Sequence, residues 1–493
     1  MANKSDIDKS MDMDLNYKYL FYRRTKIVAT IGPASESEQK LKLLIKKGMN
    51  VARINFSHGD PADHVKLVSR IRKVAQSLNA TVAILGDLCG PKIRVGMFKD
   101  NSIHLKEKTK VLITSKNVMG DTGLIPSQYK GIIKQVRVGE RILLDDGNLE
   151  LKVLKKAKDS IEAVVIRGGT LKNNKGMNLP DTDIKIAALT DKDRNDVSYC
   201  VKADVDYISL SFVRHPQDIV DLKNVLIKSK ADIKIIAKIE KPEALENINH
   251  IIDLADGIMV ARGDLGVEIA PQKVPLIQNS LITLANQNNK PVIVATQMME
   301  SMVKQSRPTR AEVSDVAGAC LAGADAVMLS AETASGKYPV ESLSIMDTVL
   351  RETEAFQFFN LGGRFNKAAA DQKSKLQGIL GIAVSQLSRD LMVRSIFVQT
   401  RSGDAARMMS SNRPAAPVFA VTHSKKVHRC LNLLWGVNPI LISGKTSRCQ
   451  QIRFAEDTIK KLKLGKKGDY IILLSGFSKD LCSTYSIEVH AIN

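Results

Sequence analysis

Residues 234–240, KIIAKIE, place a lysine and a glutamate at the end of a short apolar run. Side chains two residues apart on a strand point to the same face, so Lys238 and Glu240 share one. If Ile235 and Ile236 belong to a strand buried on both faces, that shared face is interior. Buried charges persist only where they are paired, metal-bound or catalytic, because burying an unpaired charge costs many kcal/mol. The segment therefore indicates either a structural ion pair or a reactive site.

Polar residues also end the other short apolar runs of the chain. The residues that share this position are Thr30, Pro33, Arg53, Asn55, Ser57, His58, Asp87, Ser211, Arg262, Gly263, Asp264, Thr296, Ser330 and Glu332. A single residue of this kind is usually a strand cap or a turn residue. When run after run ends in this way, the pattern favours a shared active site, because the carboxyl ends of parallel strands meet at one face of a barrel.

Two of these side chains, Glu240 and Asp264, are carboxylates on adjacent predicted strands. Proteins hold Mg²⁺ with one or two carboxylates plus substrate oxygens, so the pair predicts a shared divalent cation. Arg53, Arg94 and Lys175 are candidate clamps for phosphate. Together these residues predict a Mg²⁺-dependent enzyme acting on a phosphorylated or carboxylated anion, with the lysine of KIIAKIE as electrophile or charge stabiliser.

Short apolar runs alternate with helix-like segments along most of the chain. The runs that we predict as strands are 26–32, 51–57, 82–88, 207–213, 234–240, 257–263, 292–298 and 326–332. Segments between them, such as 37–48 and 63–78, carry Leu, Ile and Val at helical spacing. Eight strand–helix repeats with fully apolar strands predict a parallel sheet that closes as a TIM (β/α)8 barrel.

Two parts of the chain break this alternation. Residues 90–185 lose the helical pattern and carry valine-rich runs and a turn signal, DDGN, which predicts an inserted small β-barrel lid domain. After residue 353, a linker-like stretch at 362–374 precedes the helices and strands of a C-terminal α/β domain. The expected organisation is an N-terminal arm at 1–22, a barrel from 23–89 and 186–353, a lid at 90–185 and a regulatory domain at 354–493.

Composition argues against several classes of function. The formal net charge is +21, but the basic residues are spread along the chain and only 4% of residues are aromatic, so we expect no nucleic-acid partner. No apolar run approaches the roughly 20 residues needed to cross a bilayer, and no export signal is visible, so we expect no membrane association. Six singly scattered cysteines predict a reducing, cytoplasmic location.

Several longer stretches of the sequence resemble the pyruvate kinase family. In chain order they are TKIVATIGPAS (25–35), MNVARINFSHG (49–59), KGMNLP (175–180), IAKIEKPEAL (236–245), MVARGDLGVEI (259–269), ATQMMESM (295–302), RPTRAEVSD (307–315) and VMLSAETASGKYPVE (327–341). The resemblance is strong over about residues 23–353 and looser toward the C-terminus. The order and spacing of these motifs fit an inserted lid domain.

The resemblance implies that the protein transfers the phosphoryl group of phosphoenolpyruvate to ADP, giving pyruvate and ATP in the last step of glycolysis. Lys238 matches the family's lysine that stabilises charge on the phosphoryl in flight, and Arg53 matches the arginine that contacts this group. Glu240 and Asp264 match the ligands of Mg²⁺, for which Mn²⁺ is an alternative.

Further substrate and nucleotide contacts are implied by the same resemblance. Gly263, Asp264 and Thr296 match the grip on the substrate carboxylate, and Thr296 also matches the relay that protonates the enolate. We assign Ser330 to the same substrate site. The residues expected to contact nucleotide or phosphate are Thr30, Pro33, Asn55, His58, Arg94 and Lys175. Lys175 would reach the site only when the lid closes and excludes water.

One candidate site departs from the family pattern. Members that need K⁺ hold it with groups that match Asn55, Ser57, Asp87 and a following threonine, with a glutamate nearby. Here Leu88 stands at the threonine position and Lys92 at the glutamate position. The Leu88 side chain offers no oxygen, and Lys92 brings a positive charge to the place of the cation. We therefore expect activity that does not need K⁺.

Residues 399–414 resemble the sugar-phosphate-binding loop of the family's C-terminal domain, with Thr400, Ser402 and Gly403 able to hold a phosphate. Asp404 adds an opposing charge, and the tail at 473–493 lacks an arginine- and glycine-rich effector loop. A sugar monophosphate or a nucleotide is therefore a better expected effector than fructose 1,6-bisphosphate. Because the family is usually homotetrameric, we expect a homotetramer.

Two other classes of function stay open on the residues alone. One is another Mg²⁺-dependent barrel enzyme that handles a pyruvate enolate, such as an aldolase, or one in which Lys238 forms a Schiff base. The inserted domain favours the kinase, since an aldolase has no nucleotide to enclose. The other is a basic scaffold or nucleic-acid binder, which gives no reason for carboxylates beside a lysine. We interpret Lys238 and Glu240 as two partners of one ligand rather than as a salt bridge.

Overall fold

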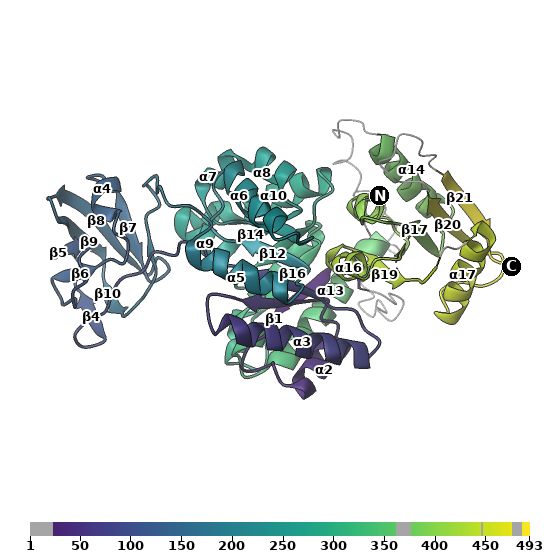
Figure 1. Cartoon of the computed structure of the whole chain (residues 1–493), viewed down its shortest axis with the longest axis horizontal. Coiled ribbons are helices and arrows are strands. Elements are labelled where there is room, and N and C mark those ends of the chain that lie inside the picture. The colour runs from purple at the N-terminus through teal and green to yellow at the C-terminus, as the bar shows by residue number, and fades with distance from the viewer. Residues whose placement is uncertain (1–22, 361–375, 445–446, 476–485) are drawn as a thin grey trace, which may run out of the picture.

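The computed structural model of the chain describes residues 23–360, 376–444, 447–475 and 486–493. The parts of the sequence predictions that lie outside the described residues are the arm at 1–22, the linker at 362–374 and the tail residues 476–485. Figure 1 shows a mainly β lid, with the short helix α4, at one end of the molecule, a barrel in the middle and an α/β domain at the other end.

The central part of the molecule is a closed barrel with the strand order β1-β16-β15-β14-β13-β12-β3-β2. The strands are β1 (Lys26–Thr30), β2 (Val51–Asn55), β3 (Ala83–Asp87), β12 (Tyr207–Leu210), β13 (Lys234–Ile239), β14 (Gly257–Ala261), β15 (Val292–Ala295) and β16 (Ala326–Leu329). All neighbouring pairs are parallel. The predicted TIM barrel is therefore confirmed.

The barrel strands end earlier than the apolar runs that predicted them. β1 ends at Thr30 rather than at residue 32, and β16 ends at Leu329 rather than at residue 332. Ser211, Asp264 and Ser330 lie beyond the last residue of the strands that precede them, whereas Thr30 and Asp87 are the last residues of their own strands. These residues consequently lie at the carboxyl-end face of the barrel, where TIM-barrel enzymes build their active sites.

Alternate residues of each strand form two separate apolar layers. Val28 and Ile236 pack inside the barrel, whereas Ile27 and Ile235 pack outward against the helices. This alternation is the period of two that a strand imposes on its side chains. Lys238 lies two residues beyond Ile236, so it points into the mouth of the barrel.

Helices surround the barrel and follow its strands in sequence. They are α2 (Glu38–Lys46), α3 (Pro61–Ser77), α5 (Asp191–Lys202), α6 (Pro216–Lys228), α7 (Pro242–Glu246), α8 (Ile248–Leu254), α9 (Arg262–Glu268), η2 (Pro271–Lys273), α10 (Val274–Gln287), η3 (Glu300–Val303), α11 (Arg310–Leu321), α12 (Ala331–Ala334) and α13 (Pro339–Asn360). Ser37, Thr190 and Thr309 cap α2, α5 and α11 by accepting hydrogen bonds from backbone N–H groups. These caps fix where the helices begin, and so limit the length of the preceding loops.

Between β3 and α5 the chain leaves the barrel and forms the lid. Its elements are β4 (Ser102–Leu105), β5 (Lys110–Thr114), β6 (Leu124–Pro126), α4 (Ile132–Gln135), β7 (Arg141–Leu144), β8 (Leu149–Lys156), β9 (Ser160–Arg167), β10 (Gly169–Lys172) and β11 (Met177–Asn178). The predicted hairpin at DDGN is confirmed, since β7 and β8 are antiparallel and Asp145, Asp146 and Gly147 have positive φ. The strands form a six-stranded sheet, β11-β7-β8-β9-β5-β6, and a separate pair, β10-β4, instead of one closed barrel.

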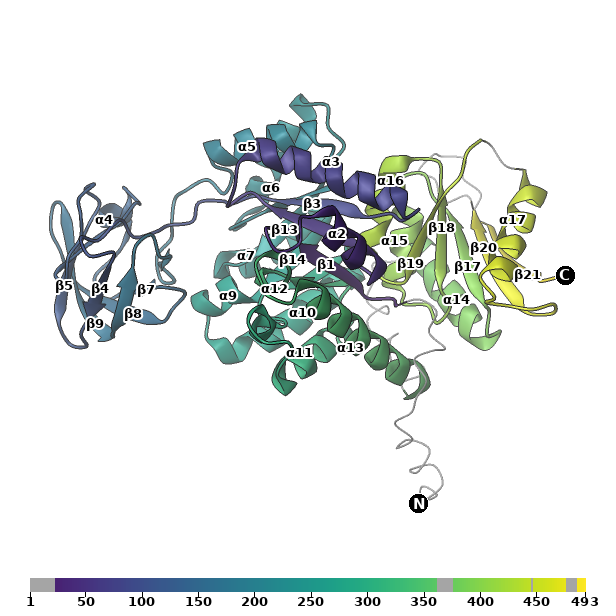
Figure 2. The ribbon, with the colours of Figure 1, turned by 90° about the horizontal axis from the view of Figure 1, so that it is seen from below.

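The C-terminal domain contains the five-stranded sheet β19-β18-β17-β20-β21, which is parallel except for β21. Its elements are α14 (Leu376–Asp390), β17 (Ser395–Gln399), α15 (Asp404–Ser411), β18 (Val418–Thr422), α16 (Lys425–Cys430), η5 (Leu431–Leu433), β19 (Val437–Leu441), α17 (Arg448–Lys461), β20 (Tyr470–Ser475) and β21 (Ser486–Ala491). The predicted α/β domain is confirmed, and Figure 2 shows it at the end of the barrel opposite the lid. In the described part of the chain, no helix has the length and apolar character needed to cross a membrane.

Candidate active site

Lys238 lies in a cluster of buried charges at the mouth of the barrel. Its Nζ is 2.9 Å from Glu240 Oε1 and 3.5 Å from Asp87 Oδ1, and it donates a 2.7 Å hydrogen bond to Ser211 Oγ. The Lys238 side chain is 12% exposed, and each carboxylate side chain is 1% exposed. The interpretation that Lys238 and Glu240 are not bonded to each other is wrong for this structure, because their shared face brings the two charges into contact.

Arg53, in the middle of β2, is held by the same cluster. Its Nε and Nη2 lie 2.7 and 2.6 Å from Asp87 Oδ2, and its Nη1 donates a 2.9 Å hydrogen bond to Thr30 Oγ1. Ser209 Oγ donates a 2.6 Å hydrogen bond to Asp87 Oδ1. Asp87 therefore fixes Arg53 and Lys238, which come from different strands, on the same side of the barrel mouth.

Burial and neighbouring charges shift the ionisation of this cluster. Burial alone lowers the pKa of Lys238, but attraction to Asp87 and Glu240 outweighs burial and raises it above its ordinary value. Burial also raises the pKa of Asp87, yet Lys238 and Arg53 reverse this effect and lower that pKa below its usual value. Lys238 and Asp87 are therefore both charged at neutral pH, which keeps a cation available for a phosphorylated ligand.

Glu240 and Asp264 supply the oxygen ligands that a divalent cation would need. Burial, with repulsion from Asp264, raises the pKa of Glu240 above its usual value, although Lys238 opposes the shift. Phe212 N donates a 2.8 Å hydrogen bond to Glu240 Oε2, and the φ of +56° at Phe212 is rare for a bulky residue. A shared cation would relieve the repulsion between the two carboxylates, so these residues fit Mg²⁺.

The donor set also suggests how much of the coordination the protein could supply. Within the described residues, no group of three or more His, Cys, Asp or Glu side chains could hold a metal ion. In phosphoryl-transfer sites, Mg²⁺ is commonly bound by one or two carboxylates, and substrate and water oxygens fill its remaining coordination positions. The residues present therefore fit a substrate-linked metal better than a closed structural one.

Gly263 and Thr296 meet beside the two carboxylates. Gly263 N donates a 2.7 Å hydrogen bond to Thr296 Oγ1, which donates in turn to Ala295 O at 2.6 Å. A Cβ on Gly263 would lie 3.3 Å from Thr296 Oγ1. Thr296 has a φ of +69°, a strained value for a β-branched residue, and such strain concentrates at functional sites. Arg262 supports this loop by donating a 2.7 Å hydrogen bond to Thr296 O.

Ser330 lies at the end of β16, on the far side of Thr30 from the main cluster. Its backbone N–H donates a 2.7 Å hydrogen bond to Glu332 Oε2, and Met299 N donates to Glu332 Oε1 at 3.1 Å. Glu332 is fully buried, and burial raises its pKa above the usual value. Glu332 thus connects the loops that follow β15 and β16. Among the described side chains, Ser330 makes no contact with Lys238.

Comparisons with known proteins agree with this geometry. The family model described as "Pyruvate kinase, barrel domain" matches residues 22–343, and the one described as "Pyruvate kinase, alpha/beta domain" matches residues 380–490. The chain belongs to the pyruvate kinase family. Pyruvate kinases from Staphylococcus epidermidis and Staphylococcus aureus are 41% identical to it over 477 residues, which is 95% of this chain and 80% of theirs. Its enzyme class is therefore that of the phosphotransferases.

A solved structure supports the same assignment at the level of the fold. The crystal structure of a pyruvate kinase from Cryptosporidium parvum is similar, with a TM-score of 0.91 and 33% sequence identity. The similarity covers 100% of both chains, so it includes the lid and the C-terminal domain as well as the barrel.

The residues that the pyruvate kinase resemblance assigns to the nucleotide lie in two groups. Thr30 and Asn55 are at barrel strand ends; Thr30 accepts from Arg53, and Asn55 Oδ1 accepts a 3.1 Å hydrogen bond from the backbone N–H of Ser57. Pro33 and His58 are exposed in the neighbouring loops. The structure therefore places these barrel residues around the mouth, with Pro33 and His58 free to meet solvent.

The second nucleotide group, Arg94 and Lys175, belongs to the lid and is bonded within it. Arg94 Nη1 donates a 3.0 Å hydrogen bond to Asn174 O, and Lys175 Nζ lies 2.7 Å from Asp145 Oδ1. Among the described side chains, neither residue contacts Lys238 or Arg53. The structure thus does not bring the lid residues to the charged cluster.

The predicted monovalent-cation site is divided in the structure. Leu88 is 1% exposed and packs in the barrel core, while Asp87 is taken up by Arg53 and Ser209. Lys92 Nζ lies 3.8 Å from Asp264 Oδ1, and no contact of Lys92 with Asp87 is recorded among the described residues. The Lys92 charge therefore lies beside Asp264, one of the two predicted Mg²⁺ ligands.

In the C-terminal domain, the predicted phosphate loop bonds to itself. Gly403 has a φ of +94°, and its N–H donates a 2.9 Å hydrogen bond to Thr400 Oγ1. Ser402 Oγ donates to Asp404 Oδ2 at 2.7 Å, so the hydroxyl is engaged by the carboxylate that opposes phosphate binding. The loop precedes α15, and Ser402 is exposed.

Two groups of residues at the site escaped the sequence predictions. Ser209 and the backbone N–H of Phe212 bond the cluster's carboxylates, and Lys241 and Glu268 form an ion pair at 2.6 Å behind them. The alternation of polar residues in SLS could have indicated Ser209. No local signal indicates Phe212, because a backbone N–H carries no sequence identity.

Proposed function

We propose that the mouth of the barrel transfers the phosphoryl group of phosphoenolpyruvate to ADP, with Lys238 stabilising the charge on the group in flight. The observation that carries this proposal is the Lys238 ammonium, buried between Glu240 at 2.9 Å and Asp87 at 3.5 Å. Phosphoryl transfer needs positioned cations more than covalent chemistry. Arg53, fixed by Asp87, is a second cation for the same phosphoryl group.

Glu240 and Asp264 are proposed to hold Mg²⁺, or Mn²⁺ in its place. When bound, such an ion would neutralise charge that develops on the phosphoryl oxygens. Gly263 and Thr296 would hold the substrate carboxylate, because their N–H and hydroxyl groups already lie together beside the metal ligands. Thr296 is also proposed in the relay that brings a proton to the enolate, and Ser330 in substrate binding.

The test is a coupled assay with phosphoenolpyruvate, ADP and Mg²⁺, in which lactate dehydrogenase and NADH report pyruvate. We expect pyruvate to form only when ADP is present. An enzyme that cleaves or joins carbon skeletons, such as an aldolase, would need no ADP, and borohydride would trap a Schiff base on Lys238. Pyruvate formation without ADP, or trapped substrate, would contradict the proposal.

The nucleotide is proposed to bind between the barrel mouth and the lid. Thr30, Pro33, Asn55 and His58 line the barrel side, and the lid residues Arg94 and Lys175 would approach when the lid closes. The ion pair between Lys175 and Asp145, which lie 2.7 Å apart, would then have to loosen. Proteolysis of the lid should slow when ADP is added; unchanged cleavage would argue against closure.

We further propose that the enzyme does not need K⁺. Leu88 removes an oxygen ligand, and Lys92 adds a positive charge beside Asp264. The family's threonine and glutamate are therefore not available to help Asn55, Ser57 and Asp87 hold a cation. Turnover should be the same in tetramethylammonium buffer with and without K⁺. A large rise in turnover on addition of K⁺ would contradict the proposed independence from K⁺.

A regulatory role of the C-terminal domain also belongs to the proposal. Thr400, Ser402 and Gly403 are the residues offered for a sugar monophosphate or nucleotide, and titration of each effector against the phosphoenolpyruvate saturation curve would test it. A homotetramer is expected from the family and would be measured by light scattering. A cytoplasmic location agrees with the described cysteines, which are all free.

A further inference from the structure

The lid reaches helix α9 of the barrel through polar groups at both ends of that helix. In its first turn, Asp264 Oδ1 lies 3.8 Å from Nζ of Lys92, which belongs to the linker that enters the lid. In its last turn, Glu268 Oε1 accepts a 2.7 Å hydrogen bond from Asn178 Nδ2 on lid strand β11. Any shift of the lid that moves these two groups therefore acts on α9.

Glu268 also forms an ion pair with Lys241, the residue directly after Glu240. Lys241 Nζ lies 2.6 Å from Glu268 Oε1, the same oxygen that Asn178 contacts. Lys241 directly follows Glu240, and Asp264 lies one helical turn before Glu268 on α9. One carboxylate thus joins three parts: the segment of Glu240, the segment of Asp264 and the lid.

Stability alone does not account for this ion pair. The side chains of Glu268 and Lys241 are 1% and 10% exposed, so both charges have lost most of their water. Glu268 Oε2 is buried and has no hydrogen-bond partner among the described residues. A buried pair gains little net stability, because desolvation offsets the attraction, and an unmatched buried oxygen adds a further penalty. A positional role explains why the pair is present.

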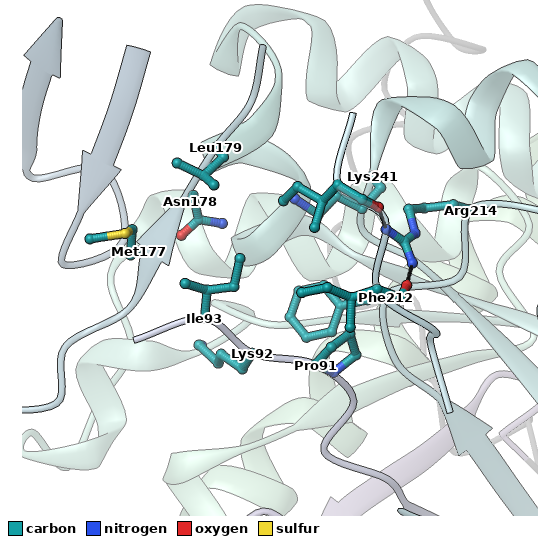
Figure 3. A pocket seen from close by; sticks show the side chains of 11 residues that line it. Pro91, Lys92, Ile93, Met177, Asn178, Leu179, Phe212, Arg214 and Lys241 are labelled. Atoms are coloured by element: carbon teal, nitrogen blue, oxygen red, sulfur yellow. Dashed lines mark hydrogen bonds between the residues drawn. The ribbon is translucent and has the colours of Figure 1, made fainter. Parts of the chain in front are cut away.

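A cavity of about 30 Å³ lies beside these groups, between the lid and the barrel. Figure 3 shows Asn178 reaching toward it from the lid side and Lys241 from the barrel side, with Met177 and Leu179 as neighbours of Asn178 on the lid side. The apolar side chains around this space make no directional bonds, while Arg214 on the barrel side donates hydrogen bonds to the backbone oxygens of Ile184 and Ile186. The hydrogen bond from Asn178 is therefore a specific polar link between the two sides that lid movement could make or break.

We propose that Glu268 is a positioning residue that transmits the position of the lid to the two carboxylates of the metal site. The inference rests on the proposed role of Glu240 and Asp264. With Asn178 bonded, Glu268 and Lys241 hold α9 against the end of β13, which keeps Asp264 beside Glu240. When the lid withdraws Asn178, α9 gains freedom and the carboxylates hold the cation less tightly.

The test compares Asn178→Ala and Asn178→Asp with the wild-type full-length chain. Mn²⁺ binding, measured by electron paramagnetic resonance, should weaken about fivefold in Asn178→Ala, the low end of coupling between sites. Asn178→Asp should weaken it further, because two carboxylates then repel each other. Hydrogen exchange of residues 262–268 should rise in the same order, while that of 274–287 should not change.

Matched controls come from Asn148, an exposed lid residue whose side chain makes no hydrogen bond to the described part of the chain. Asn148→Ala and Asn148→Asp should leave Mn²⁺ affinity and exchange as in the wild type. If the Asn178 variants only lower the melting temperature, with Mn²⁺ affinity unchanged, Asn178 is a structural residue and the inference is wrong. Equal effects of the Asn148 and Asn178 variants would also overturn it.

A second variant, Glu268→Gln, keeps the shape of the side chain and removes its charge. The effect of Asn178→Ala on Mn²⁺ affinity should shrink in the Glu268→Gln background, because both substitutions act on one link. Full additivity would show that Asn178 acts by another route. Neither Mn²⁺ binding nor hydrogen exchange needs turnover. If the wild-type protein does not convert phosphoenolpyruvate but the Asn178 variants still show the expected order of Mn²⁺ affinity and exchange, only the proposed function is contradicted.

Discussion

Lys238 remains charged in a buried position because two carboxylates, Asp87 and Glu240, lie within 3.5 Å and 2.9 Å of its Nζ. Their attraction outweighs burial and raises the pKa of Lys238 above its ordinary value. Arg53 contacts the other oxygen of Asp87, so the two cations are fixed by one anion. A substrate phosphate would therefore meet positive groups that are already positioned, which is the main requirement for stabilising phosphoryl in transit.

Replacement of this lysine by methionine tests its role at the residue scale. Lys238→Met should lower kcat by on the order of 10³-fold, because it removes the ammonium at that point while Arg53 stays bonded to Asp87. Mn²⁺ binding should stay largely intact, since the carboxylates remain. Lys234→Met, on the same strand but at its other end, is the control and should keep normal turnover. Near-normal turnover of Lys238→Met in the coupled assay would refute the assignment.

At the scale of elements, helix α5 ties the barrel to the start of the lid. Asp193 in its first turn is fully buried and accepts hydrogen bonds from Thr190 N at 3.0 Å and from Gly90 N at 3.1 Å. Gly90 begins the lid linker with a φ of +67°, and a Cβ there would lie 2.8 Å from the Phe212 ring. A single carboxylate thus caps the helix after the lid and holds the linker before it.

Asp193→Ala should lower the free energy of unfolding by about 2–4 kcal/mol, since it removes a helix cap and leaves the buried Gly90 N–H without its partner. Asp191→Ala removes an exposed charge from the same helical turn and should cost only about 0.5 kcal/mol. Urea denaturation followed by circular dichroism would measure both. Similar losses for the two variants would show that the bond to Gly90 contributes little.

For the whole molecule, the base of the barrel is closed by the C-terminal domain. Leu433 of η5 packs into the interior layer of the barrel, and Lys26 Nζ donates a 2.7 Å hydrogen bond to Val437 O. Arg413 and Asp325 form a buried ion pair at 3.0 Å across the same interface. The domain that we propose to bind effectors therefore contacts the barrel at the end opposite the active site (Figure 2).

This interface should make stability depend on pH through Lys26. Burial, with repulsion from Arg23, lowers the pKa of Lys26 from 10.5 to about 7 in the folded protein. Between these values the unfolded chain binds more protons, so this contribution to stability rises with pH, by at most about 1.4 kcal/mol per pH unit. Below the folded pKa both states carry the charge, and the contribution is constant.

The comparison that isolates this effect is between wild type and Lys26→Met. The difference in unfolding free energy, wild type minus variant, should increase from pH 7 to pH 9, because the methionine does not titrate. Urea midpoints at three pH values would measure it, and the other ionisable groups cancel in the difference. Parallel pH curves for the two proteins would show that burial does not lower the pKa of Lys26.

The sequence by itself determined the barrel and the faces of its strands. Apolar runs alternating with helix-like segments predicted the barrel, and the two-residue spacing of Lys238 and Glu240 predicted that they share one face of their strand. The same logic predicted that Asp264, at the end of the next strand, would lie near Glu240. These features are local or repeat regularly, so periodicity encodes them.

Only the tertiary structure decided which charged groups bond to one another. Lys238 on β13 pairs with Asp87 on β3, with β12 between these two strands, and Glu268 bonds to both Lys241 and Asn178 of the lid. Such contacts depend on strand register, on the closure of the barrel and on the angle at which the lid leaves it. These are properties of packing between distant segments, and no local pattern in the sequence records them.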